Sequence, residues 1–113
     1  CLSAGEVSPS AWPILRACVD DALAIPDDAA RDAMRGLARG RWGDRPLVSG
    51  ESGVAPLAAL LLAAADPALR GALGLTAASR AVLIGSEGAT APDLWADAVG
   101  LRPEEIIGEP TPA

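Results

Sequence analysis

The sequence PLVSGESGVAPLAALLLAAA, residues 46–65, decides the fold prediction. A short apolar run reaches a turn with glycines at Gly50 and Gly53, and an alanine- and leucine-rich stretch follows at once. A turn between a strand and a helix is a common ligand site, because the first backbone N–H groups of a helix have no partner within it. The stretch therefore predicts a strand, a turn and a helix, with a candidate binding site at the turn.

A second stretch repeats this order. In RAVLIGSEGATAPDLWADAVG, residues 80–100, Gly85 and Gly88 interrupt the chain between an apolar run and a helical pattern. Two such turns in one parallel sheet lie at the same edge, since strands that feed crossover helices all end there. We therefore expect the two turns to form one wall of an active site whose reactive groups lie outside this chain.

The remaining pattern predicts an α/β fold with about three parallel strands and flanking helices. Trp12 and Trp95 are expected in the core. We expect residues 1–100 to form one α/β segment and residues 101–113 a docked or disordered tail, because prolines and acidic residues dominate there. The predicted strands are 22–25, 47–49 and 81–84, and the predicted helices are about 10–19, 27–40, 54–65, 67–73 and 92–99.

Composition excludes several classes of function. The 113 residues are 50% hydrophobic, enough for one core, and 15 acidic against 9 basic residues give a net charge of −6, which argues against a nucleic-acid partner. The longest apolar run, residues 54–65, contains Pro56 and is too short to span a membrane. Two cysteines without any histidine predict no metal site, and we expect a cytoplasmic protein with reduced thiols.

Two turn hydroxyls are candidate ligand contacts. Ser86 and Thr90 in GSEGAT could bond a ring nitrogen or a carboxylate, but Thr90 could equally cap the helix near Pro92 while Ser86 faces water. In the first turn, Gly50 and Gly53 could let backbone approach a ligand, or could serve only the turn conformation.

The chemically reactive residue types are few. Glu51 and Glu87 occupy like positions in the two turns and could form an acid–base pair, although solvated or arginine-paired glutamates are the commoner case. The sequence contains neither lysine nor histidine, so the chain cannot supply a Schiff-base lysine or the usual general base.

Three motifs together resemble a known family. LSAGE at residues 2–6 with SAWPIL at 10–15, then VSGESGVAPLAALL, then VLIGSEGATAPDLW, are similar in order and spacing to the C-terminal part of the diaminopropionate ammonia-lyases. These enzymes belong to the fold type II (tryptophan synthase β-like) family that depends on pyridoxal 5′-phosphate. The resemblance covers about residues 2–99.

The resemblance implies a partial large domain that flanks the cofactor. Ser86 would hydrogen-bond the pyridine nitrogen, with Thr90 its neighbour in the same turn, and Gly50 and Gly53 would border the ring and the substrate. The implied reaction removes ammonia from 2,3-diaminopropionate to give pyruvate. The partners implied are a small amino-acid substrate, the remainder of the parent enzyme and a second subunit in a homodimer.

The chain also departs from the family. The Schiff-base lysine, the glycine-rich phosphate cradle and the acidic residues that take the substrate proton lie upstream in the family, so this chain alone should be inactive. Ala4 stands where the family often has cysteine, and Pro56 where a small or flexible residue is expected. Two alternatives remain: a non-catalytic binding or assembly module that keeps the fold, and a relative of serine/threonine dehydratase or cysteine synthase.

Overall fold

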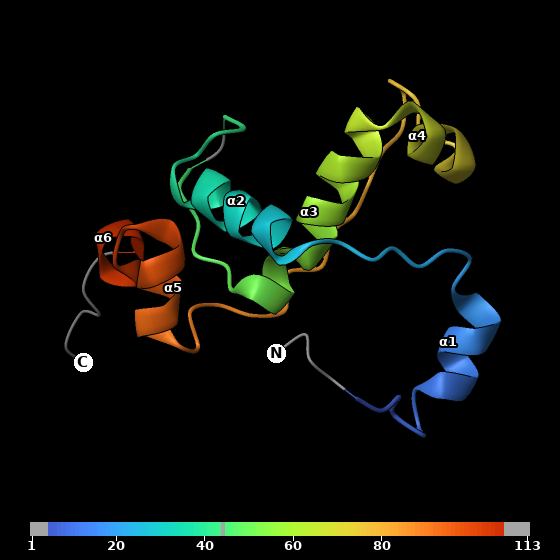
Figure 1. Ribbon diagram of the computed structural model, residues 1–113, viewed down its shortest axis with the longest axis horizontal. Coiled ribbons are helices and arrows are strands. Elements are labelled where there is room, and N and C mark those ends of the chain that lie inside the picture. The colour runs from blue at the N-terminus through green and yellow to red at the C-terminus, as the bar shows by residue number, and fades with distance from the viewer. Residues whose placement is uncertain (1–4, 44, 108–113) are drawn as a thin grey trace.

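The computed structural model describes residues 5–43 and 45–107, and within these ranges the regular structure is helical (Figure 1). The predictions for Leu2 to Ala4 and for residues 108–113 concern positions outside the described residues. The helices are α1 (Trp12–Cys18), α2 (Asp27–Ala38), α3 (Glu51–Ala65), α4 (Pro67–Leu73), α5 (Pro92–Val99) and α6 (Pro103–Ile107).

The prediction of an α/β fold with about three parallel strands is wrong. Residues 22–25, 47–49 and 81–84 are not helical, yet none of them forms a strand in the described part of the chain. A strand exists only when a neighbour accepts and donates its backbone hydrogen bonds. Here the bonds of the second segment reach other elements instead: Leu47 N–H donates to the Leu37 carbonyl at 2.9 Å, and Gly50 N–H donates to that of Glu87 at 3.0 Å.

Most predicted helices lie within two or three residues of their expected positions. The start of α3 differs from the prediction. The helix begins at Glu51 and so contains Ser52 and Gly53, two residues expected in the turn. Pro56 is therefore the sixth residue of α3 and lies inside the helix, beyond the first turn where a missing N–H costs little.

The core forms where α2 crosses α3 and α5. The amphipathic face of α2 contributes Met34 and three alanines, and small side chains let the helices approach closely. The buried residues of this cluster are Ala30, Ala33, Met34, Ala38, Val54, Ala58, Trp95 and Val99. The burial of Trp95, at 3% exposure, agrees with its predicted place in the core.

Helices α1 and α4 lie outside this core. In Figure 1, α1 projects away from α2 and α3, and α4 lies at the far end of α3. Neither α1 nor α4 contains a buried residue, and Trp12 is 50% exposed, so its predicted core position is wrong. In the described tail, α6 packs on α5 and Pro103 is buried, as expected for a docked segment.

No single helix of the described residues is long and apolar enough to cross a bilayer. Together α3 and α4 meet the length and composition of a span, but they are bent by 111°.

Candidate functional site

The two predicted turns lie against each other. Gly50 N–H donates to the Glu87 carbonyl at 3.0 Å, and the Ser49 hydroxyl donates to the same oxygen at 3.4 Å. A Cβ on Gly53 would lie only 2.5 Å from that carbonyl oxygen. Residues 49–53 and 85–88 therefore share one rim, and glycine at position 53 is what lets the backbones come so close.

Trp95, a residue of α5, also bonds to the first turn. Its indole Nε1 donates to the Ser49 carbonyl at 2.9 Å, and the ring is almost fully buried. The bond satisfies a polar group of Trp95 that would be costly to bury alone. The first turn is thus bonded both by the second turn and by α5, the helix that follows the second turn.

A hollow of about 120 Å³, open to solvent, lies along this rim. Its walls combine backbone of the two turns with the apolar side chains of α2 and α5, while Glu51, Glu87 and Thr90 contribute the polar side chains. The described lining residues are Met34, Gly50, Glu51, Glu87, Gly88, Ala89, Thr90, Ala91, Leu94 and Trp95.

The predicted site residues have different positions relative to the hollow. Gly50 and Thr90 line it, Gly53 is buried behind the rim against Glu87, and Ser86 is exposed. Ser86 has the solvent exposure expected of a serine that faces water. Thr90 does not cap α5, whose N-cap is Ala91 and has no side-chain capping bond, so the capping alternative for Thr90 is wrong.

Neither Ser49 nor Ser52 caps α3 in the described structure. The N-cap of α3 is Gly50, and no side chain caps that helix. Instead Ser49 bonds to Glu87, and the Ser52 Oγ atom is buried without a hydrogen-bond partner in the described part of the chain.

The two glutamates line the same hollow. Glu87 is half-buried and its carboxylate lies over Gly50, whereas Glu51 is exposed in the first turn of α3. A carboxylate in the first turn of a helix is favoured by the partial positive charge there. This arrangement accounts for Glu51 without an acid–base role.

Sequence reasoning missed the contributions of Met34 and Leu94 to the hollow. Met34 belongs to the buried face of α2, and an apolar helical stripe predicts burial but not which cavity a residue borders. Leu94 is 71% exposed on α5, so a pattern that predicts burial does not find it. The bond from Trp95 to Ser49 joins residues 46 positions apart, and no local pattern indicates it.

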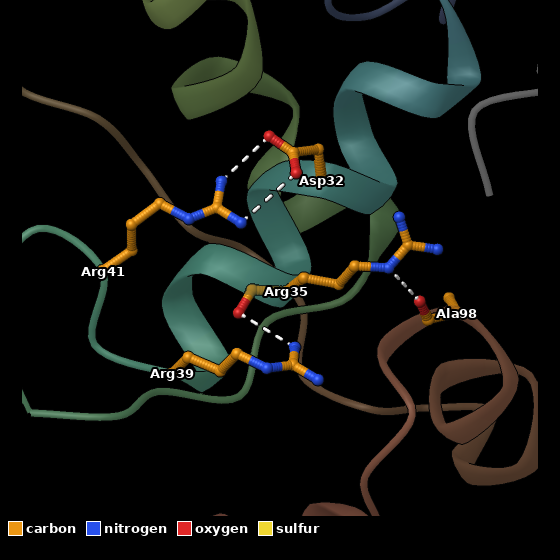
Figure 2. Close-up of polar contacts among 5 residues, drawn as sticks. All are labelled: Asp32, Arg35, Arg39, Arg41 and Ala98. Atoms are coloured by element: carbon orange, nitrogen blue, oxygen red, sulfur yellow. Dashed lines mark hydrogen bonds and ion pairs between the residues drawn. The ribbon is translucent and has the colours of Figure 1, made fainter.

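Two arginines bond the C-terminus of α5: Arg35 of α2, whose bond to Ala98 is drawn in Figure 2, and Arg39, the C-cap residue of α2. Arg35 Nε donates to the Ala98 carbonyl at 2.7 Å, and Arg39 Nη2 donates to the Val99 carbonyl at 2.9 Å. Cations at a helix C-terminus bond its free carbonyls and oppose its negative partial charge. These two bonds hold the C-terminus of α5, whose first turn borders the hollow.

Comparison with known proteins adds one relative. Over 102 residues the chain is 36% identical to an enzyme of Salmonella typhimurium (strain LT2), and the match covers 87% of the chain. The chain is similar to a diaminopropionate ammonia-lyase. It spans 25% of the length of that ammonia-lyase, so the similarity concerns one segment of it. No family model and no solved structure matches the chain.

Proposed function

We propose that the chain is the C-terminal part of a pyridoxal-phosphate-dependent lyase that eliminates ammonia from 2,3-diaminopropionate to give pyruvate. The observation that carries this proposal is the 36% identity to the Salmonella diaminopropionate ammonia-lyase over 102 residues. The geometry supports it as well, because the two turns named by the resemblance share one rim through the 3.0 Å bond from Gly50 to Glu87.

The residues on the rim fit one edge of the cofactor. A neutral hydroxyl can donate a hydrogen bond to a pyridine nitrogen. Thr90 lines the hollow, and both Thr90 and Ser86 are exposed in the same turn. The described lining includes no arginine, and the sequence contains no lysine, so the phosphate and the aldehyde would be held by other parts of the enzyme.

The chain's own residues would bind and orient rather than react. When bound, pyridoxal phosphate withdraws electrons from the substrate carbon that loses its proton. Ser86 or Thr90 would hold the ring nitrogen, and Trp95 and Met34 would exclude water from one side of the hollow. A neutral partner for the ring nitrogen withdraws fewer electrons than a carboxylate does, which suits β-elimination.

The direct test uses the full polypeptide in which residues 1–113 occur. It should release pyruvate and ammonia from 2,3-diaminopropionate, and do so faster than from L-serine or L-threonine. Faster turnover of serine or threonine would instead favour a dehydratase relative. Absence of bound pyridoxal phosphate, measured by its absorbance, together with no turnover would contradict the proposal.

A pair of single variants then tests the rim. Ser86→Ala and Thr90→Val each remove one hydroxyl, and we expect one of them to lower the affinity for pyridoxal phosphate about tenfold, as expected when a hydrogen bond to a charged or polar partner is lost. Ser79→Ala is the matched control, because Ser79 bonds Thr76 in a distant turn. Unchanged affinity in both rim variants would show that neither hydroxyl holds the ring.

The exposed apolar residues favour the second candidate, a binding or assembly module. Val82 is 93% exposed, Ile84 76% and Leu94 71%, and helix α1 has no buried residue. Exposed apolar side chains in such number are typical of a surface that another polypeptide covers. This role requires no cofactor, so the absorbance measurement separates it from the lyase.

A further inference from the structure

We infer that Trp95 is a positioning residue of the candidate site, which holds the turn before α3 in register with the turn before α5. The inference rests on the proposed function for the role of that site. Trp95 itself makes no chemical contribution to the reaction in this inference.

The contacts of Trp95 set it apart from the other tryptophans. Its Nε1 donates to the Ser49 carbonyl at 2.9 Å, directly before Gly50, where α3 is capped. Glu87, from the other turn, accepts from the backbone of Gly50 and from the hydroxyl of Ser49. Residues 49 and 50 are thus bonded from two directions, by the turn before α5 and by the first half of α5.

The burial of the indole makes this bond hard to replace. Trp95 is 3% exposed, so water does not reach the Ser49 carbonyl from the side that the ring covers. Loss of the N–H leaves the carbonyl of half-buried Ser49 without this donor, and an unpaired polar group that is partly shielded from water is costly. The first turn would then relax by moving away from α5.

Such a movement would change the hollow directly. The same indole forms part of its wall, together with Gly50 from the first turn and Thr90 from the second. A shift of the first turn therefore alters the spacing between the backbone of Gly50 and the hydroxyl of Thr90. Positioning of this kind governs how well a rigid, flat ligand is held between two segments.

Trp95→Phe is the test variant, because phenylalanine keeps an aromatic ring in the core and removes the indole N–H. Trp42→Phe is the matched control, since Trp42 is 43% exposed and lies beyond the C-terminus of α2, away from the rim. Both variants are made in the full polypeptide that contains the chain.

Two measurements on these variants decide the inference. In the cofactor-free protein, hydrogen exchange of residues 47–53 should become at least about fivefold faster in Trp95→Phe and stay unchanged in Trp42→Phe, the factor expected for one lost hydrogen bond. The affinity for pyridoxal 5′-phosphate should fall by about the same factor in Trp95→Phe alone.

Each result has one meaning. Unchanged exchange in Trp95→Phe overturns the inference, and so does faster exchange with unchanged cofactor affinity. Equal effects of both variants would also overturn it, because they would reflect general destabilisation. If the unaltered polypeptide binds no pyridoxal phosphate, the proposed function fails, and the exchange measurement alone still decides whether Trp95 couples the two turns.

Discussion

At the scale of single residues, Gly53 shows why the two turns can meet. It lies within α3, where alanine would have the better helix propensity, yet a Cβ there would come within 2.5 Å of the Glu87 carbonyl oxygen and 2.7 Å of the Ser49 hydroxyl. Gly53→Ala should lower the free energy of unfolding by about 1–3 kcal/mol, because the backbone neighbour cannot move away cheaply.

A second glycine supplies the control for Gly53→Ala. Gly71 lies inside α4, and no atom of the described residues comes within 4 Å of a Cβ built there. Gly71→Ala should therefore stabilise the chain by up to about 1 kcal/mol through helix propensity alone. Urea unfolding of both variants measures the effects. Equal effects of the two substitutions would mean that the close approach at Gly53 does not matter.

Also at the residue scale, Asp32 makes a contribution that depends on pH. Arg41 donates to its carboxylate at 2.9 Å and 3.3 Å, and these hydrogen bonds hold the pKa of Asp32 below its ordinary value (Figure 2). The stabilisation is complete above the ordinary pKa of about 4 and is lost as the pH falls through the lowered pKa.

The size of the Asp32 contribution is limited by exposure. The Asp32 side chain is 59% exposed, so solvent screening reduces the pair to about 0.2–1 kcal/mol at neutral pH. Asp32→Asn should lose that amount at pH 7 and become as stable as the unaltered chain in acid. Thermal unfolding across a pH series checks this, and a difference that persists in acid would contradict it.

At the scale of elements, α5 is held at both ends. Its first half is fixed by the bond from Trp95 to Ser49, and its last carbonyls accept from Arg35 and Arg39 of α2. Arg39→Gln should lower the free energy of unfolding by about 1 kcal/mol, because the charged donor to the Val99 carbonyl is lost at a helix C-terminus.

Arg31→Gln is the control for that prediction. Arg31 lies on the same helix but makes only a 3.9 Å pair with Asp28, whose side chain is 96% exposed. It should change the free energy of unfolding by less than about 0.5 kcal/mol. Denaturant unfolding of the two variants, compared side by side, measures the difference, and equal losses would argue against a specific role for the α5 carbonyls.

The helices could be predicted from sequence because their signals are local. Asp66 before Pro67, for example, caps α4 by accepting from the N–H groups of Ala68 and Leu69, and Gly74 ends it with a positive φ of 67°. The absence of strands from the described part of the chain could not be recognised in the same way. The run at residues 81–84 has strand composition, but a strand also requires a hydrogen-bonding neighbour, which composition does not reveal.

The candidate site was predictable only in part, for the same reason. Spacing placed Gly50 and Thr90 in turns, and both line the hollow. The start of α3 was misplaced because Ser52 and Gly53 are typical of turns, while packing against Glu87 accommodates Gly53 within the helix. Tertiary contact overrode local preference at these residues.

At the scale of the whole molecule, the chain is less compact than its length allows. Its radius of gyration is 15.9 Å, whereas a compact domain of this length has about 13 Å. The difference agrees with the position of α1, which projects away from α2 and α3 in Figure 1. Residues 82–84 are exposed as well, at 93%, 41% and 76%. Exposed apolar side chains such as Val82 and Ile84 are typical of a surface that a partner polypeptide or another copy of the chain covers.

These exposed apolar residues should govern how the chain associates. The purified chain should associate and should bind a hydrophobic dye, because Val82 and Ile84 are 93% and 76% exposed. The double variant Val82→Glu with Ile84→Glu should reduce both properties without loss of helix, since neither residue belongs to a helix or to the buried core. Ala77→Glu with Ala78→Glu is the matched control, because it adds the same charge at nearby exposed residues that are small. Sedimentation velocity, dye fluorescence and circular dichroism measure the three properties. A monomer that binds no dye would contradict the prediction. Equal effects of both double variants would mean that added charge, and not the loss of this apolar run, reduces association.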